Sequence, residues 1–452
     1  MLMPRATTTR TRLLALAALC ALAGLAVALV PRAVTATATA PTATAGAATR
    51  FTTQTRAGFP AGDDWEPSTA TDRFGHVYLL YKHYDVAGQP SCASCDLHLL
   101  LQVSGDRGKT WSAPRALDPE PVKGGQFDPQ IAVDSADGRT VWASYLQNGK
   151  SSIAVMKSTD FGQTWSGPTI VENLQRATDK DILAVRGETV AVAFNAVQKV
   201  YAAISQNGGA TWATQLITDG SAQLGWSLGG GGGIDSHGTI YFAFDGYTQN
   251  GGAKGPVHLY VSRSADGGQT WSLTLVGTSG APYPCTNCGF AFLGAQLTLA
   301  VGSDDAVYLL WNATADQTDY APERIYFARS TDRGATYSAR QDVSLAASGV
   351  EHCFPAITSG AGAGDVRIGW MDQSSGAWNV WYRASGNGGA SFGAETQVSG
   401  YVPGYSYLTA SGFGLPYGDY FQLAVDDRGG TQAAWGESSS YAGPGNIWLA
   451  HS

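Results

Sequence analysis

The sequence predicts an all-β repeat protein, because two patterns recur along the chain and glycine is abundant. One pattern is a short turn motif that occurs six times, and the other is a pair of apolar segments joined by a Gly/Asp turn, which occurs seven times. The chain has 57 glycines in 452 residues and only 14% charged residues, which fits a large domain rich in turns. Recurrence at a fixed period indicates stacked supersecondary units.

The turn motif predicts a tight β-hairpin. Each copy places a polar residue, a turn glycine and a Thr/Ser–aromatic pair between two apolar segments. The Asp or Asn side chain can accept backbone N–H bonds within its own turn, and the glycine supplies a positive φ. The copies are SGDRGKTW from Ser104, STDFGQTW from Ser158, SQNGGATW from Ser205, SADGGQTW from Ser264, STDRGATY from Ser330 and SGNGGASF from Ser385.

This motif resembles the Asp-box, or bacterial neuraminidase repeat (BNR), of the sialidase superfamily. The resemblance implies a β-propeller of four-stranded antiparallel blades over residues 51–452. In that family the boxes are structural hairpins set away from the active site, so the motif alone implies no sialidase activity.

The second pattern predicts seven blades rather than the six of a typical sialidase. The six intervals between the turns at Asp72 and Asp426 give a mean period of about 59 residues, so residues 51–452 hold about seven units. The last unit ends before a box, and it lacks a fourth strand. We expect Phe51–Arg56 to supply that strand, which would close the ring and leave no exposed sheet edge.

The N-terminal residues predict export. Arginines precede an apolar run from Leu13 to Val30, and small residues surround Ala36, so residues 1–36 are expected to be a signal peptide. An uncleaved membrane anchor is the alternative, because the run is long enough to span a bilayer. Residues 37–50 are predicted to be an Ala/Thr-rich linker. We therefore expect a secreted monomer with no membrane contact beyond this segment.

The charge balance argues against nucleic acid as a partner. The chain carries 28 Lys+Arg against 36 Asp+Glu, a net charge of −8, and it has no basic cluster. Neutral or cationic ligands are easier to accommodate. The resemblance implies a carbohydrate or cell-surface glycan as the partner.

The cysteines after the signal segment predict two local disulfides, Cys92–Cys95 and Cys285–Cys288, with Cys353 left over. The alternative is a metal centre, because two CxxC pairs can form a four-thiolate zinc site. The histidines expected on the same face as these cysteines are His83, His98, His258 and His352.

In a propeller, the loops that lead into each blade share one face, which usually carries the ligand site. Carboxylates on this upper face can serve acid–base cleavage of a glycosidic bond or bind calcium, although no cofactor is required. Each one can also simply cap its loop. The candidate catalytic residues are Asp64, Glu66, Asp128, Asp179, Asp181, Asp419 and Tyr420. The candidate ligand-binding residues are Trp65, Arg176, Trp226, Tyr283, His352 and Tyr417.

The chain departs from a true sialidase in its arginines. A sialidase of this superfamily binds the substrate carboxylate with three arginines, one of them in a Phe/Tyr-Arg-Ile-Pro motif. The corresponding region here reads TRAGFPAGDDWEP, and most arginines fall in turns on the opposite face. The resemblance therefore predicts a glycoside hydrolase or polysaccharide lyase rather than an exo-sialidase. A non-catalytic propeller that binds glycan or protein is the alternative, and the cysteine metal centre is a third.

The run Gly229–Gly233 is not a phosphate loop, because no Lys-Ser/Thr follows it. It is expected on the inner strand of the fourth blade, where the lack of side chains would widen the channel or let a ligand approach the backbone. A simple strand irregularity is the alternative.

Overall fold

The computed structural model describes residues 49–58, 62–85, 97–119, 124–173, 178–196, 199–218, 226–249, 254–283, 293–405, 408–440 and 443–452, without the side chains of 226–229 and 417–419. All regular elements in these ranges are β-strands. The described part of the chain has no helix long and apolar enough to cross a membrane.

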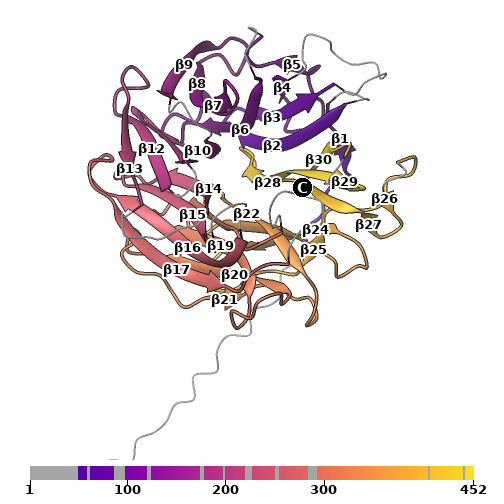
Figure 1. Cartoon of the computed structure of the whole chain (residues 1–452). Helices are drawn as coiled ribbons and strands as arrows, with labels where there is room; N and C mark the ends of the chain where they lie inside the picture. Colours follow the sequence, from indigo (N-terminus) through magenta and orange to yellow (C-terminus); the bar gives the residue numbers. More distant parts are fainter. Residues whose placement is uncertain are drawn as a thin grey trace, which may run out of the picture. The chain divides into compact units, whose positions relative to one another are not determined.

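Seven four-stranded antiparallel sheets surround a central axis, so the chain is a seven-bladed β-propeller (Figure 1). Blade one contains β2 (Asp63–Thr71), β3 (Val77–Tyr84), β4 (Leu99–Ser104) and β5 (Arg115–Ala116). Blade two contains β6 (Gln126–Val133), β7 (Val141–Gln147), β8 (Ser152–Ser158) and β9 (Ser166–Asn173). Blade three contains β10 (Asp179–Arg186), β11 (Thr189–Ala196), β12 (Lys199–Ser205) and β13 (Ala213–Leu216). Blade four contains β14 (Trp226–Ile234), β15 (Ile240–Gln249), β16 (Lys254–Ser264) and β17 (Ser272–Ser279).

Blade five contains β18 (Leu297–Val301), β19 (Val307–Thr314), β20 (Glu323–Ser330) and β21 (Gln341–Asp342). Blade six contains β22 (His352–Ser359), β23 (Val366–Asp372), β24 (Asn379–Ser385) and β25 (Thr396–Gln397). Blade seven contains β28 (Leu415–Val425), β29 (Thr431–Ser438), β30 (Asn446–His451) and β1 (Thr55–Arg56). A small hairpin, β26 (Leu408–Thr409) and β27 (Gly412–Phe413), lies between blades six and seven in the sequence.

Blade seven joins the two ends of the propeller. Strand β1 pairs antiparallel with β30, with Thr55 opposite Leu449 and Arg56 opposite Trp448. The amide of Ala57 donates a 2.9 Å hydrogen bond to the carbonyl of Ile447. An early segment of the chain is therefore the outermost strand of the last blade.

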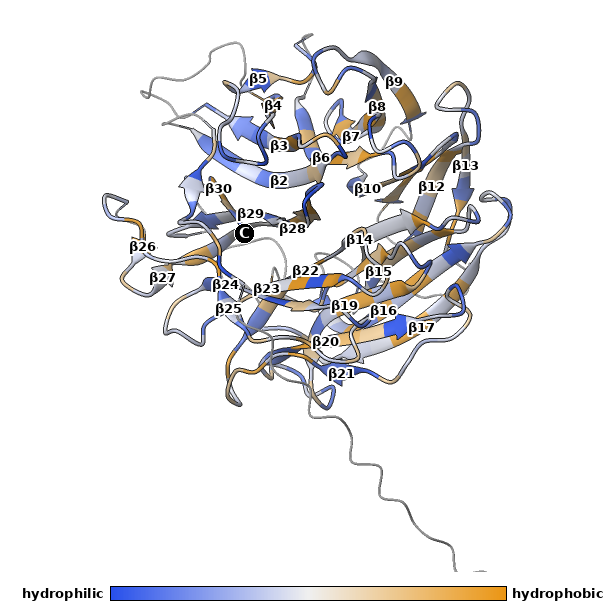
Figure 2. Cartoon of the chain, turned by 180° about the vertical axis from the view of Figure 1, so that it is seen from behind, coloured by the Kyte–Doolittle hydropathy of each residue, from blue (hydrophilic) through white to orange (hydrophobic). Residues whose placement is uncertain are grey.

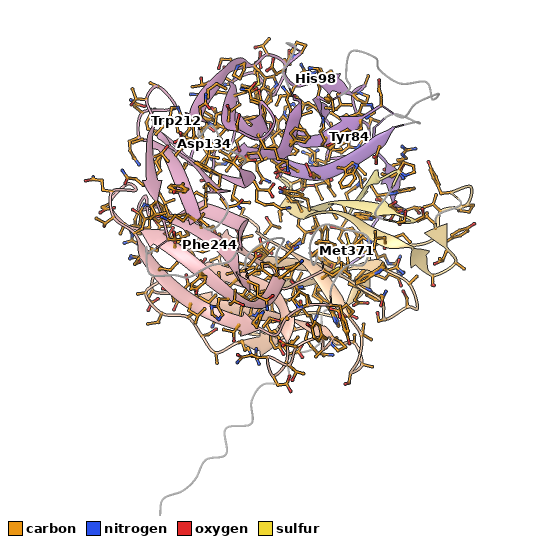
Figure 3. The ribbon with its side chains drawn as sticks, viewed as in Figure 1. Tyr84, His98, Asp134, Trp212, Phe244 and Met371 are labelled. Carbon is orange, nitrogen blue, oxygen red and sulfur yellow. The ribbon has the colours of Figure 1, made fainter. Side chains whose placement is uncertain are left out.

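Apolar side chains pack between neighbouring blades and form the core. Strands β7, β19 and β29 are buried along their whole length, because blades cover both faces of each second strand. In Figure 2 many strand segments are hydrophobic, and short hydrophobic stretches also occur in loops. Phe244 and Met371, labelled in Figure 3, are on the second strands of blades four and six, and both are fully buried.

The six turn motifs form Asp-box hairpins. In the first, Asp106 accepts the amide of Thr110 at 2.8 Å and its hydroxyl at 2.7 Å, and the indole of Trp111 donates to the carbonyl of Gly108 at 3.1 Å. These hydrogen bonds from Thr110 lower the pKa of Asp106 to about 2. In the Asn207 hairpin, Oδ1 of Asn207 accepts the amide of Thr211 at 2.9 Å, and its Nδ2 donates to the Thr211 hydroxyl at 2.9 Å. Trp212, labelled in Figure 3, is the aromatic residue of this box, and its indole donates to the carbonyl of Gly209.

Six of the seven inner strands contain a β-bulge near their first residues. In four of them a residue other than glycine has a positive φ within the bulge: Glu66 (56°), Asp128 (51°), Lys180 (50°) and Phe354 (49°). Such a conformation costs about 1–3 kcal/mol per residue. Bulges redirect side chains, so these bulges determine which side chains face the channel at that end.

The glycine run fits between two closely packed inner strands. A Cβ on Gly230 would collide with the backbone carbonyl of Leu297 on β18, and one on Gly231 would lie 2.6 Å from the amide nitrogen of Leu299. Close approach of β14 to β18 therefore accounts for the missing side chains.

Candidate functional site

The channel has a cavity toward each end. A cavity of about 210 Å³ lies among the inner strands beside the bulges and is lined in part by Lys180, Phe354 and Tyr420. A larger cavity of about 560 Å³ lies at the other end and is lined by hairpin turns. Carboxylates in those turns accept hydrogen bonds from nearby backbone amides. Asp134, labelled in Figure 3, accepts the amides of Ala136 and Gly187 at 2.8 Å. The bulge end therefore offers the better candidate site.

Two carboxyl groups, those of Asp128 and Asp179, are hydrogen-bonded to each other at the bulge end. The Asp128 side chain is 2% exposed and that of Asp179 is 26% exposed. Burial, together with the charge of Asp128, raises the pKa of Asp179 to about 7. Burial also disfavours ionised Asp128, but Lys150, Lys180 and the hydrogen bond outweigh it and lower its pKa to about 2. Near neutral pH, Asp128 is ionised and Asp179 can still carry a proton.

Lys150 binds both carboxyls from the turn between β7 and β8. Its Nζ lies 3.0 Å from Oδ1 of Asp179 and 3.5 Å from Oδ2 of Asp128. Burial lowers the pKa of Lys150, but Asp128, Asp179 and Glu66 outweigh burial and raise it, so the ammonium stays charged. Glu66 joins the group because its Oε2 accepts the backbone amide of Asp128 at 3.0 Å.

Two further lysines lie over aromatic rings beside this group. The Nζ of Lys180 is 4.2 Å from the ring centre of Tyr420, which lines the cavity. The Nζ of Lys82 is 4.5 Å from the ring of Tyr84, labelled in Figure 3, and 5.1 Å from that of Phe127. Rings of this kind stabilise a cation through their π-faces. Sequence reasoning missed all three lysines, because none stands in a recognisable motif.

Two predicted catalytic acids lie inside the blade walls. Asp64 is fully buried, and its Oδ1 is 2.6 Å from Nδ1 of His83. Asp181 is also fully buried, and its Oδ2 accepts a hydrogen bond from the hydroxyl of Ser144 at 2.5 Å. Burial raises the pKa of both carboxyls. Neither side chain joins the Asp128–Asp179 pair.

His352 likewise lies in the interior, although it was predicted to bind ligand. It is fully buried, its Nδ1 is 2.8 Å from the carbonyl of Glu323, and its Nε2 is 3.6 Å from Asp372. Burial lowers the pKa of His352, so the neutral ring is favoured. Neighbouring Cys353 is a buried free thiol.

The other predicted ligand-binding aromatics that the structure describes lie nearer the surface. Trp65 is partly buried and meets the ring of Tyr84 edge-on, with 6.4 Å between centroids. Tyr283 is 61% exposed, and its ring centroid is 5.7 Å from that of Tyr320, which is 51% exposed.

Several predicted residues lie outside the described residues: Arg176, Cys92, Cys95, Cys285 and Cys288, together with the side chains of Trp226, Tyr417 and Asp419. Both predicted disulfides and the proposed four-thiolate site fall there. Within the described ranges, no three His, Cys, Asp or Glu side chains are grouped so as to hold a metal ion.

One family model matches the first part of the chain. Residues 47–228 match the model of the BNR repeat-like domain. None of the curated proteins compared with the chain matches its sequence.

Solved structures resemble the chain over most of its length. A protein of unknown function from Dyadobacter fermentans DSM 18053 is 14% identical, with a TM-score of 0.51 over 89% of this chain and 98% of that one. An ulvan lyase, described as a new family of polysaccharide lyase, is 10% identical, with a TM-score of 0.50 over 87% and 95%. The Hadza microbial sialidase Hz136 is 14% identical, with a TM-score of 0.45 over 86% and 65%. At such low identity these similarities concern the fold alone.

Proposed function

We propose that this chain is a BNR-repeat β-propeller of the sialidase superfamily and an exported enzyme that cleaves a glycosidic bond in a carbohydrate. The observation that carries the proposal is the hydrogen-bonded Asp128–Asp179 pair, with one pKa of about 2 and one of about 7 at the end of the channel. Paired carboxyls whose pKa values are pushed apart are typical of acid–base sites.

Asp179 is the general acid in this proposal. A carboxyl with a pKa of about 7 is protonated often enough near neutral pH to protonate the leaving oxygen of a glycosidic bond. Its proton goes to that oxygen as the bond to the sugar carbon breaks. Hydrolase and lyase chemistry both need this step, and they differ in whether water or an elimination completes the reaction.

Asp128 is a positioning residue for Asp179. Carboxyls that act on opposite sides of a glycosidic bond are about 5–9.5 Å apart, whereas these two are within hydrogen-bonding distance of each other. The second reacting group therefore comes from elsewhere, and Tyr420 on the cavity wall is the candidate. The Lys180 ammonium, 4.2 Å from the Tyr420 ring centre, would stabilise negative charge there.

The test is product analysis with the purified protein. Sialosides, neutral oligosaccharides and uronic-acid polysaccharides are incubated with it, with and without calcium, and products are identified by mass spectrometry. An unsaturated uronate, seen by its ultraviolet absorbance, would identify a lyase. The Asp179→Asn variant should lower kcat by about 10²–10⁴-fold.

Asp137→Asn is the matched control, because Asp137 is exposed in a hairpin turn away from this cluster. Circular dichroism of both variants checks that they fold. Full activity of folded Asp179→Asn would refute the role given to Asp179.

A non-catalytic glycan-binding propeller is the second candidate, favoured by the exposed Tyr283–Tyr320 ring pair. Flat apolar rings suit stacking on sugar faces. Glycan binding that is lost in Tyr283→Ala, with no product from any substrate, would support this candidate over the enzyme.

A further inference from the structure

Asp245, on the second strand of blade four, is one of the residues that line the central cavity. Apart from Asp245, the residues that line this cavity lie on inner strands or, for Gln296, directly before one. Asp245 lies on β15, where its backbone partner on β14 is Leu228, and it is 1% exposed.

On another wall of the cavity, a series of hydrogen bonds determines which way the side-chain amide of Gln130 is oriented, that is, where its Oε1 and Nε2 lie. The amide N–H of Thr69 can only donate, and it lies 3.0 Å from Gln422, so the atom it meets must be Oε1. Ser68 also donates to that oxygen, at 3.0 Å. The Nε2 of Gln422 then lies 3.4 Å from Oε1 of Gln130.

This arrangement leaves the Nε2 group of Gln130 on the cavity side. Gln130 is 7% exposed and lines the cavity, and its Nε2 has no hydrogen-bond partner among the described residues. An unpaired buried donor has lost its hydrogen bonds to water without replacing them, which costs free energy. An acceptor in the cavity would recover that free energy.

The cavity has the size and charge for a small neutral ligand. Its volume is about 210 Å³, whereas a single water needs roughly 10–15 Å³. Among the described residues that line it, Lys180 is the one base and Asp245 the one acid, so neither sign of charge predominates. Hydroxyl groups both donate and accept hydrogen bonds, and they suit a wall that holds an amide donor and a carboxylate acceptor.

We infer that the central cavity binds one neutral sugar residue, with Gln130 donating to its hydroxyls and Asp245 accepting from them. The inference rests on the proposed function and narrows it to a hydrolase of neutral glycans, because a lyase needs a uronic acid at the cleaved bond. The backbone amide of Lys180 donates to Oδ2 of Asp128 at 3.2 Å, while its side chain lines the cavity. The cavity therefore begins next to the acid pair.

The test measures binding of glucose, galactose, mannose, N-acetylglucosamine and glucuronate to the purified protein by saturation-transfer NMR and calorimetry. At least one neutral sugar should bind, and glucuronate should bind about tenfold or more weakly than glucose. Gln130→Leu and Asp245→Asn should each weaken binding of the neutral sugar by about tenfold or more, the expected cost of losing one hydrogen bond of this kind.

Matched controls are Gln163→Leu and Asp137→Asn, because both residues are exposed in hairpin turns of blade two that do not line the cavity. They should leave sugar binding unchanged. Absence of binding by every neutral sugar, or tighter binding of glucuronate than of glucose, would overturn the inference. Using two separate cavity variants keeps the test decisive if one of them does not fold.

The Asp179→Asn variant separates this inference from the proposed function. If it loses activity while the wild type binds no neutral sugar, the cavity inference is wrong and the acid role stands. If neutral sugar binds as expected but Asp179→Asn keeps full activity, the proposed catalytic site is wrong and the cavity is a binding site alone.

Discussion

The carboxyl groups of Asp128 and Asp179 are hydrogen-bonded to each other, although they come from the inner strands of two neighbouring blades. Each lies beside a bulge, and Lys150 binds both. Such a pair loses its protons in two steps that belong to the pair, at pKa values of about 2 and about 7. Between these two pH values the pair holds one proton, which it can donate to a substrate.

The Lys150→Met variant should shift the alkaline limb of the pH–activity profile to higher pH. The Lys150 charge lowers the pKa of Asp179, so its removal raises that pKa further. A general acid with a higher pKa stays protonated to higher pH. The measurement is kcat/KM between about pH 5 and 9.

Lys157→Met is the control for that shift. Lys157 is a lysine of the same blade, and its Nζ lies 4.8 Å from the ring of Trp142 rather than beside a carboxyl of the pair. Its profile should match the wild type. An alkaline limb that stays in place or moves to lower pH in Lys150→Met would contradict the role of the pair.

The Gly230→Ala variant should be strongly destabilised. Its Cβ would collide with the Leu297 carbonyl, and backbone cannot move aside as a side chain can, so we expect a loss of about 1–3 kcal/mol or more. Gly386→Ala is the matched control for Gly230→Ala. Gly386 also lacks a positive φ, and its Cβ would meet nothing within 4 Å. Urea unfolding should give the control a change within about 0.5 kcal/mol. Equal effects in the two variants would contradict close packing of β14 on β18.

Removing β1 should destabilise blade seven. A chain that begins at residue 59 lacks the strand that pairs with β30, and it leaves the edge of β30 unpaired. Compared with a chain that begins at residue 49, its melting temperature should be lower and it should aggregate more readily on heating. Light scattering during a thermal scan tests both. Identical scans would show that the paired ends contribute nothing to stability.

The repeats made the fold predictable from sequence. Each turn motif brings its own hairpin chemistry, as in Asp106 and Thr110, so local sequence is enough to place it. The period of the apolar segments then gave seven blades. Individual upper-face acids such as Asp128 and Asp179 were also predicted as candidates, because their place in the blade follows from the period.

The site itself depended on contacts between blades, which no local pattern encodes. Whether an acid faces the channel or the wall depends on the bulge register: Asp179 joins the pair, while Asp181 two residues later is buried against Ser144. One signal was available and was missed. Acidic or aromatic residues precede proline at equivalent bulge positions, in Glu66-Pro67, Asp128-Pro129 and Phe354-Pro355.

The stability of the protein should be greatest in mildly acidic solution, because two groups of carboxyls act in opposite directions. The Asp-box carboxyls Asp106, Asp160, Asp266 and Asp332 have pKa values lowered to about 2 by hydrogen bonds from their box threonines. An unfolded aspartate titrates near 3.9, so the stability they contribute is complete above about pH 4 and is lost as the pH falls toward 2.

Buried acids lower the stability of the folded protein at higher pH. Burial raises the pKa of Glu323 and Glu437 well above the usual value, so the folded state keeps protons that the unfolded state releases above about pH 4. Stability therefore falls as the pH rises from there toward neutrality. Calorimetric melting temperatures from about pH 3 to 8 should pass through a maximum, and Glu323→Gln should reduce the decline on the alkaline side. A melting temperature that rises steadily from pH 4 to 8 would mean that these buried carboxyls are ionised in the folded protein.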